Sequence, residues 1–220
     1  MKAYVSLWSA DPLAIGAAVD LVGDRADGFH VEVFDGHTVP DLLFGPHFVA
    51  ALRRRTGALI DVHLSVDDPD FWAKRFIASG GDMVTVQARA CPDLRATLDA
   101  ISRAGARRAV ALEVDEPVEA VYELLADVDR VLVMGTRLGV KGVDLDRAAA
   151  DRVTALVEER RRREARAEIV VDGGIRRHTV PTLALAGADG VVPGSLVFGD
   201  PDPRSAIDWI HSLPVRSPTS

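Results

Sequence analysis

Short apolar runs alternate with longer amphipathic segments along the whole chain. The apolar runs are rich in Val, Ile and Leu, which is typical of strands buried on both faces. They predict eight strands, at residues 3–8, 28–33, 58–64, 82–87, 108–113, 129–134, 167–171 and 189–193. The segments that follow them have helical spacing and Asp, Pro or Gly at their ends. They predict helices at residues 12–23, 45–55, 68–79, 92–104, 117–126, 145–164, 176–187 and 202–211.

This strict alternation predicts one parallel sheet covered by helices. Eight repeats close more naturally into a (β/α)8 barrel, an α/β fold, than into an open doubly wound sheet, which is the second possibility. The length of 220 residues suits one such domain, and no linker-like composition interrupts the series. We therefore expect a single barrel over residues 1–212 and a disordered tail, rich in Pro and Ser, over residues 213–220.

The composition narrows the classes of partner. A net charge of -7, with basic residues scattered or confined to helical Arg runs, gives no reason to expect nucleic acid or an anionic membrane. No apolar run is long enough to span a bilayer. The single cysteine, Cys91, cannot form an internal disulfide, which favours a reducing cytoplasm. We expect a cytoplasmic protein that acts on a small molecule.

Ionisable side chains stand at the ends of three predicted strands. His30 and Glu32 lie on one face of the second strand, because side chains alternate along a strand. The third strand ends near His63, and Asp172 follows the seventh. The loops after the strands form the mouth of a barrel, so all four side chains are expected to converge there.

Two imidazoles and two carboxylates form a ligand set that suits one divalent transition metal, either Zn, Fe, Mn or Co. Taken singly, each of these residues is more often a satisfied buried histidine or a carboxylate that caps a helix. Convergence of all four at one mouth favours the metal site over that simpler interpretation.

Glycines follow the seventh and eighth strands, where barrels commonly bind phosphate through backbone N–H groups. Gly173 and Gly174 come after the seventh strand, and Gly194 with Ser195 after the eighth. Glycine is also frequent in ordinary turns. Because both pairs fall on the two strands where phosphate sites recur, we favour a phosphate site.

Several segments resemble the ribulose-phosphate 3-epimerase family. Residues 29–45 resemble its H-x-D-x-M-D-G-x-F-V-P-N-x-x-F-G segment. Residues 6–11 are similar to its S-I-L-S-A-D opening, and residues 61–66 to its D-x-H-L-M-V segment. Residues 132–134, 171–175 and 194–198 continue the series in order. The resemblance therefore runs from the first predicted strand to the last.

The resemblance implies a metal-dependent isomerase that inverts the carbon beside the carbonyl of a ketose phosphate. The substrate would be ribulose 5-phosphate, xylulose 5-phosphate or a related, more acidic sugar phosphate. His30, Glu32, His63 and Asp172 would hold the metal, and Glu32 and Asp172 would transfer protons through an enediolate. Substrate and phosphate contacts would fall on Ser6, Gly139, Lys141, Gly142, Gly173, Gly174, Gly194 and Ser195. By analogy the protein would be a homo-oligomer.

The chain also departs from the family pattern, mainly on the substrate side. Glu32 stands where the family has aspartate, which keeps a carboxylate but lengthens its reach. We expect five residues to affect substrate specificity. Met134 is retained from the family pattern, and the other four differ from it: Phe34, Ser65, Gln87 and Arg137.

Two cations mark the loop over residues 136–143. Arg137 and Lys141 stand there, where the family is mostly Gly, Pro and aromatic. They could hold a second anionic group or the phosphate of the substrate. Alternatively, both side chains point to solvent or to Glu113 and Asp144.

Three alternatives for the function stay open. A lyase or isomerase could use the same enediolate on the same scaffold. A barrel that binds a sugar phosphate without turnover would also explain the departures from the family pattern. The orotidine-monophosphate decarboxylase group is less favoured, because its D-x-K-x-x-D arrangement is not found in the sequence.

Overall fold

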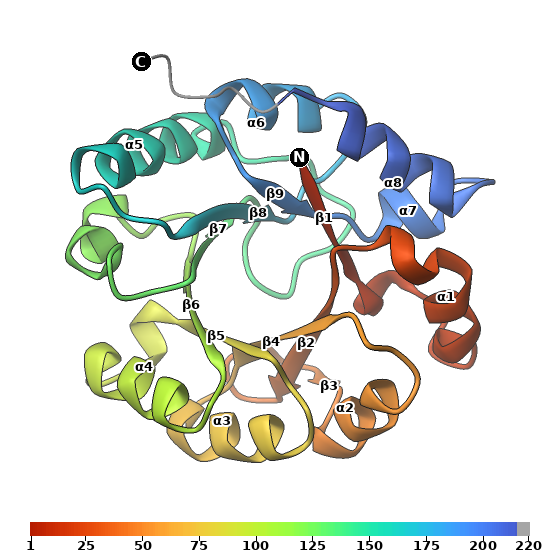
Figure 1. Cartoon of the computed structure of the whole chain (residues 1–220), viewed down its shortest axis with the longest axis horizontal. Coiled ribbons are helices and arrows are strands. Elements are labelled where there is room, and N and C mark those ends of the chain that lie inside the picture. Colours follow the sequence, from red (N-terminus) through yellow and green to blue (C-terminus); the bar gives the residue numbers. More distant parts are fainter. Residues whose placement is uncertain (215–220) are drawn as a thin grey trace.

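A closed ring of eight parallel strands forms the centre of the computed structural model, which describes residues 1–214 (Figure 1). The strands are β1 (Lys2–Ser6), β2 (Gly28–Asp35), β4 (Leu59–Ser65), β5 (Met83–Gln87), β6 (Arg107–Leu112), β7 (Arg130–Met134), β8 (Glu168–Asp172) and β9 (Gly190–Val192). Because β1 pairs with both β2 and β9, the sheet has no free edge within the ring. The predicted (β/α)8 barrel is confirmed, and the open sheet is excluded.

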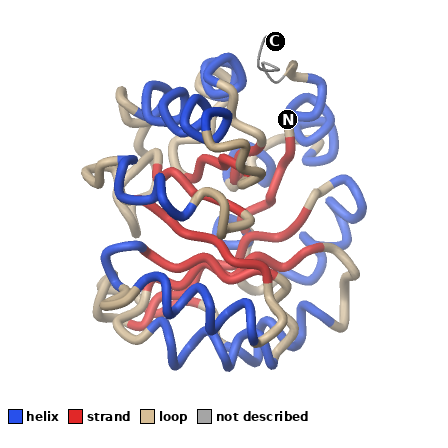
Figure 2. The backbone as a smooth tube through the Cα atoms, turned by 60° about the vertical axis from the view of Figure 1, so that its left-hand side comes forward, coloured by secondary structure: helices blue, strands red, loops and turns tan. Residues whose placement is uncertain are grey.

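Helices cover the outer face of the ring, as the tube view shows (Figure 2). They are α1 (Ile15–Val22), α2 (Pro46–Arg53), α3 (Pro69–Ala78), α4 (Leu94–Arg103), α5 (Ala149–Arg162), α6 (Val180–Ala186), α7 (Ser195–Phe198) and α8 (Pro203–Ser212). The side chains of Asp68, Asp93 and Asp202 accept backbone N–H groups at the starts of α3, α4 and α8. These caps satisfy donors that have no partner inside a helix. No helix in residues 1–214 is both long and apolar enough to cross a membrane.

The predicted α-helix over residues 117–126 is wrong in type. The segment Val118–Leu124 is a 3-10 helix, η4. Its buried side chains, Val118, Val121 and Leu124, are spaced three apart, and a 3-10 helix aligns such positions on one face. Three shorter 3-10 helices also appear without having been predicted: η1 (Leu7–Ser9), η2 (Gly23–Arg25) and η3 (Ala88–Ala90).

Other element boundaries differ from the predicted ones. Strand β2 continues to Asp35 and pairs there with a two-residue antiparallel strand, β3 (Leu42–Leu43), which was not predicted. The helix predicted from residue 145 begins at Ala149, and the one predicted from residue 176 begins at Val180. The additional residues form loops after β7 and β8 at the mouth of the barrel. The predicted disordered tail falls mostly on residues 215–220, which lie outside the described part of the chain.

The interior of the barrel is divided into an apolar half and a polar half. The apolar half is a small cluster contributed mainly by β1 and β6–β9: Tyr4, Ala111, Leu132, Met134, Val170 and Val192. Strands β2, β4 and β5 contribute the buried polar residues His30, Glu32, Asp61, His63, Thr85 and Gln87. The opposite faces of the strands pack against the helices in one large apolar core. Most of the buried polar side chains of the barrel interior therefore come from β2, β4 and β5, while β7 adds the buried Arg130.

Candidate active site

Strand register brings the predicted metal ligands together. In the parallel pair β2–β4, His30 lies beside Asp61 and Glu32 beside His63. Asp172 is the last residue of β8, at the mouth. One ligand atom from each of His30, Glu32, His63 and Asp172 lies within 4.8 Å of the others. The two histidines and Glu32 are buried, whereas Asp172 is partly exposed toward the pocket.

The nitrogen and oxygen atoms of this cluster face one another at short distances. His30 Nε2 lies 3.0 Å from Glu32 Oε1 and 3.7 Å from Asp172 Oδ2. His63 Nδ1 lies 2.9 Å from the same Glu32 oxygen. An imidazole nitrogen and a carboxylate oxygen lie this close when a shared proton or a cation lies between them.

Burial and neighbouring charges shift the pKa values of the cluster in different directions. Burial raises the pKa of Asp172 to about 7. The His30 charge acts to lower this pKa, and the like charge of Glu32 acts to raise it. Burial also acts to raise the pKa of Glu32, but the His63 charge and the hydrogen bonds from both histidines outweigh it and lower that pKa. Burial lowers the pKa of His30, yet hydrogen bonds to Asp61 and Glu32 raise it well above its usual value. The cluster therefore favours bound positive charge.

One oxygen of the cluster supports a metal ion in particular. Glu32 Oε2 is buried and has no hydrogen-bond partner within the described part of the chain. A buried carboxylate oxygen is normally satisfied, and a divalent cation would satisfy it. The donor set of two imidazoles and two carboxylates also matches transition-metal preferences. The four residues thus fit a divalent metal.

Gln87 contacts the outer nitrogen of His63. Its Nε2 lies 2.8 Å from His63 Nε2, while its Oε1 is buried without a partner among residues 1–214. When His63 offers Nδ1 as a ligand, its Nε2 carries the proton and needs an acceptor. The oxygen and nitrogen of a glutamine amide are assigned from the hydrogen bonds around them. Exchanging the two in Gln87 places Oε1 against that proton. Gln87 can therefore hold His63 in the ligating tautomer.

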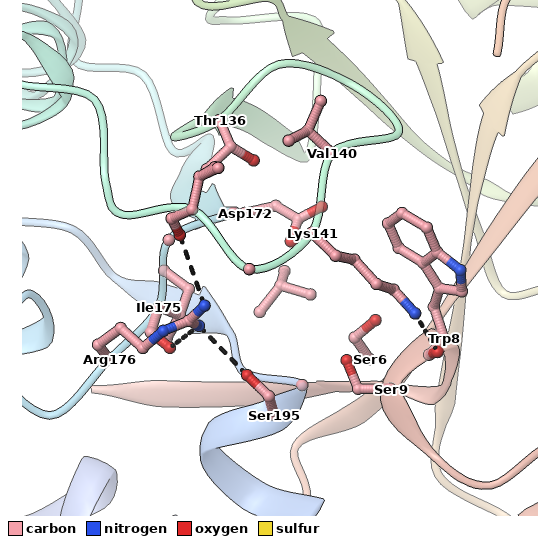
Figure 3. Close-up of a pocket in the computed structure, with 16 residues that line it drawn as sticks. Ser6, Trp8, Ser9, Thr136, Val140, Lys141, Asp172, Ile175, Arg176 and Ser195 are labelled. Atoms are coloured by element: carbon pink, nitrogen blue, oxygen red, sulfur yellow. Dashed lines mark hydrogen bonds between the residues drawn. The ribbon is translucent and has the colours of Figure 1, made fainter.

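A pocket of about 170 Å³ opens beside Asp172 (Figure 3). Its walls come from η1, from the loop after β7, and from the turns after β8 and β9. The predicted contact residues that line it are Ser6, Lys141, Gly142, Gly173, Gly174, Gly194 and Ser195. We call His30, Glu32, His63 and Asp172 the metal-capable cluster. Asp172 belongs both to this cluster and to the lining of the candidate phosphate site.

Two of these positions require glycine. Gly173 has a φ of +91°, and a Cβ there would lie 2.2 Å from Thr136 Oγ1. A Cβ on Gly194 would lie 2.2 Å from Ser9 Oγ. These distances are far shorter than van der Waals contact, so any side chain would displace the loops that form the pocket. The absence of a side chain lets the backbone line the pocket directly.

Arg176 is a pocket residue that the sequence interpretation missed. Its Nη1 donates to Ser195 Oγ at 3.2 Å and to Ile175 O at 3.1 Å, as Figure 3 shows. The guanidinium therefore lies at the rim of the candidate phosphate site. Its position two residues after Gly174 was the available signal, but the segment from residue 176 was assigned to a helix.

The two loop cations lie in different places. Lys141 lines the pocket, donates from Nζ to Trp8 O at 2.7 Å, and lies 3.9 Å from the centre of the Trp8 ring (Figure 3). Burial lowers its pKa. Arg137 is not among the lining residues of this pocket; its side chain is 71% exposed, and its guanidinium lies 4.0 Å from the Asp115 carboxylate. Of the alternatives for Arg137, the one in which the side chain points to solvent agrees with this exposure, and the neighbouring carboxylate is Asp115 rather than Glu113 or Asp144.

The remaining predicted residues lie around the site rather than in the pocket. Gly139 packs against Val39, because its missing Cβ would come within 2.5 Å of that side chain. Phe34 and Trp8 lie nearly perpendicular to each other, with ring centroids 5.1 Å apart. Ser65 is buried, and its Oγ has no partner within residues 1–214. Met134 belongs to the apolar half of the barrel interior.

Comparison with known proteins places this arrangement in one family. Residues 2–198 match the model of the Ribulose-phosphate 3 epimerase family. Ribulose-phosphate 3-epimerase of Bacillus subtilis strain 168 is 34% identical over 215 residues, covering 96% of this chain and 98% of that protein. The enzyme of the same name from Treponema pallidum strain Nichols is 38% identical over 194 residues, covering 88% and 89%.

A solved structure shows the same fold at lower identity. KGPDC from Streptococcus mutans superposes with a TM-score of 0.75 at 20% identity, covering 96% of this chain and 97% of that one. This likeness supports the barrel alone. The match over nearly the whole length, together with relatives above 30% identity, shows that the chain belongs to the ribulose-phosphate 3-epimerase family and is an isomerase that acts on carbohydrates.

Proposed function

We propose that the protein is a metal-dependent epimerase that inverts the carbon beside the carbonyl of a ketose phosphate. The observation that carries this proposal is the pair of carboxylates, Glu32 and Asp172, within one metal-capable cluster at the edge of a glycine-lined pocket. The relatives named above are ribulose-phosphate 3-epimerases, so ribulose 5-phosphate and xylulose 5-phosphate are the first substrates to test.

His30, Glu32, His63 and Asp172 would hold the metal. A divalent ion at this position would polarise the carbonyl and hydroxyl oxygens of the sugar and so stabilise the negative charge of an enediolate. The donor set is compatible with Zn, Fe, Mn or Co.

The two carboxylates would move the protons. One removes the proton from the carbon beside the carbonyl, and the other returns a proton to the opposite face. Asp172 lines the pocket, so its carboxylate can reach a proton of a bound sugar. Glu32 lies deeper, and its lowered pKa keeps it ionised. A bound cation would favour the ionised form of both groups.

The pocket would orient the substrate by its phosphate. Gly173, Gly174 and Gly194 allow close approach of the backbone, and Ser195 and Arg176 add a hydroxyl and a guanidinium. Arginine binds phosphate through two parallel N–H groups. A phosphate held there leaves the sugar carbons to extend toward Asp172 and the cluster behind it.

Solvent-proton exchange tests this function. Phosphorylated ketoses incubated with the enzyme in D2O, with the metal varied, are expected to gain one deuterium at the carbon beside the carbonyl and to yield the epimer. Loss of a carbon fragment or movement of the carbonyl would instead identify a lyase or another isomerase. Ketose phosphates that bind without exchanging would identify a binding protein.

Lys141 is expected to contribute to substrate binding. Because its ammonium lines the pocket and is partly desolvated, Lys141→Ala should raise KM or lower kcat/KM by about tenfold, the scale of a lost hydrogen bond to a charged group. Steady-state kinetics with the substrate identified by deuterium uptake measure the effect. A substrate more acidic than a pentulose phosphate should show the larger loss.

Arg137→Ala is the matched control, because Arg137 belongs to the same loop but is exposed and pairs with Asp115. It should leave both kinetic constants close to wild type. Wild-type kinetics for Lys141→Ala as well would show that the loop cations take no part in binding.

A homo-oligomer and a cytoplasmic location stay predictions. The absence of an internal disulfide partner for Cys91, which is a buried free cysteine, agrees with a reducing compartment. Sedimentation of the purified protein would measure the oligomeric state.

A further inference from the structure

A buried cation lies inside the barrel, below the metal-capable cluster. Arg130, the first residue of β7, has a fully buried side chain. Its Nη1 donates to Asp61 Oδ2 at 2.8 Å, and its Nη2 donates to Glu168 Oε2 at 2.9 Å. The guanidinium also lies over the Tyr4 ring, 3.7 Å from its centre. Buried ion pairs add little net stability, because desolvation offsets the attraction, so the arrangement points to a positioning role.

The Asp61 carboxylate connects this guanidinium to the cluster. The Oδ2 atom that accepts from Arg130 also faces His30 Nδ1 at 3.0 Å. The other oxygen, Oδ1, accepts the Thr85 hydroxyl at 2.7 Å. Both oxygens are therefore fixed by donors, and the carboxylate cannot rotate without breaking a buried hydrogen bond.

The fixed carboxylate determines how His30 is presented. An ionised carboxylate only accepts, so His30 Nδ1 must carry a proton and donate it to Asp61. In the neutral imidazole the other nitrogen, Nε2, is then free to act as a ligand. That nitrogen is the one that faces Glu32 and Asp172.

We propose that Arg130 is a positioning residue of the metal site, which fixes Asp61 and through it the tautomer and orientation of His30. The inference rests on the proposed metal site. The Arg130 guanidinium does not touch the metal-capable cluster, and it acts there through the Asp61 carboxylate, which lies between them. Partners of this kind change metal affinity even though they are not ligands.

The two ends of the guanidinium provide a matched comparison. Asp61 leads to His30, whereas Glu168 leads away from the cluster, to the Tyr4 hydroxyl at 2.9 Å and to the Lys2 ammonium. A purely structural role would make both ends equally important for stability and neither important for metal binding. A positioning role makes only the Asp61 end important for metal binding.

Zinc affinity, measured by competition with a chromogenic chelator, separates these roles. Arg130→Lys keeps the charge but removes the planar guanidinium that bonds to both carboxylates, and Thr85→Val removes the hydroxyl that donates to Asp61 Oδ1. Each should weaken Zn²⁺ binding by about tenfold, the lower end of the range for residues that orient ligands. Glu168→Gln should lower Tm and leave the zinc Kd at its wild-type value.

Wild-type zinc affinity in folded Arg130→Lys would overturn the proposal. If that variant does not fold, Arg130→Gln, which leaves a neutral donor, is measured in its place. If the wild-type protein binds no Zn²⁺, Mn²⁺ or Co²⁺, the proposed function fails, and imidazole ¹⁵N NMR then tests the inference separately. The Nδ1-protonated signal of His30 should be present in wild type and diminished in the Arg130 variant; an unchanged signal contradicts the proposal.

Discussion

Asp172→Asn is expected to lower turnover by about 10²–10⁴-fold, the usual contribution of a positioned acid–base group. Asp172 lies where the pocket meets the cluster, and an amide in its place neither accepts nor donates a proton in the reaction. Asparagine has nearly the same shape, so the barrel should remain folded. Deuterium uptake and epimer formation are measured together, with circular dichroism as the check of folding.

Glu32→Asp is the informative companion, because it keeps the charge and shortens the reach. If the longer side chain is matched to this cluster, the shorter one should lose activity. Activity held or increased would show that the difference from the family pattern carries no functional weight. Turnover retained in Asp172→Asn would overturn the mechanism with two carboxylates.

Removal of either histidine is expected to abolish stoichiometric metal binding. Wild-type protein purified under mild conditions should carry about one divalent transition metal per chain, since the four ligand groups form one site. His30→Ala and His63→Ala each remove one of the two nitrogen ligands. The carboxylate of Glu32 then loses a hydrogen-bond partner as well. Metal content by mass spectrometry measures the loss.

His47→Ala provides the control for this experiment. His47 is an exposed residue of α2, away from the cluster, and its replacement should leave the metal content unchanged. Full occupancy in both cluster variants would refute the assignment of His30 and His63 as ligands. Chelator-treated wild type should lose turnover and regain it on addition of metal.

The alternation of strands and helices was sufficient to predict the barrel. The positions of four ionisable residues near strand ends were sufficient to predict that they meet at one mouth. Both work because a strand has a period of two and the parallel strands all end at the same face. His30 and Glu32 could be placed on one side of β2 from alternation alone. The register that sets Glu32 beside His63 depends on strand pairing, which no local pattern specifies.

Residues whose role depends on distant partners could not be predicted. Arg130 appears in the sequence as an ordinary charge at the start of an apolar strand, yet it is buried because Asp61 and Glu168, far from it in sequence, are its neighbours. Arg176 was hidden by a helix boundary that lies four residues further along. Arg137 and Lys141 have the same charge in the same loop, and only the folded loop distinguishes their directions.

The closure of the barrel has a consequence for its dynamics. The join between β1 and β9 is shorter than the ladder of β2 and β4. It has the register pairs Lys2 with Gly190 and Ala3 with Val191 and ends at the hydrogen bond from Ser6 N to Pro193 O, whereas β2 and β4 pair from Gly28 with Leu59 to Phe34 with Ser65. A short ladder opens more readily, so amide hydrogens at this join should exchange faster than those of β2 and β4. Ser6 and Gly194 flank the same join and line the pocket. A bound phosphate would therefore hold the two ends of the sheet together, and the enzyme would become more rigid where its chain begins and its last strand ends.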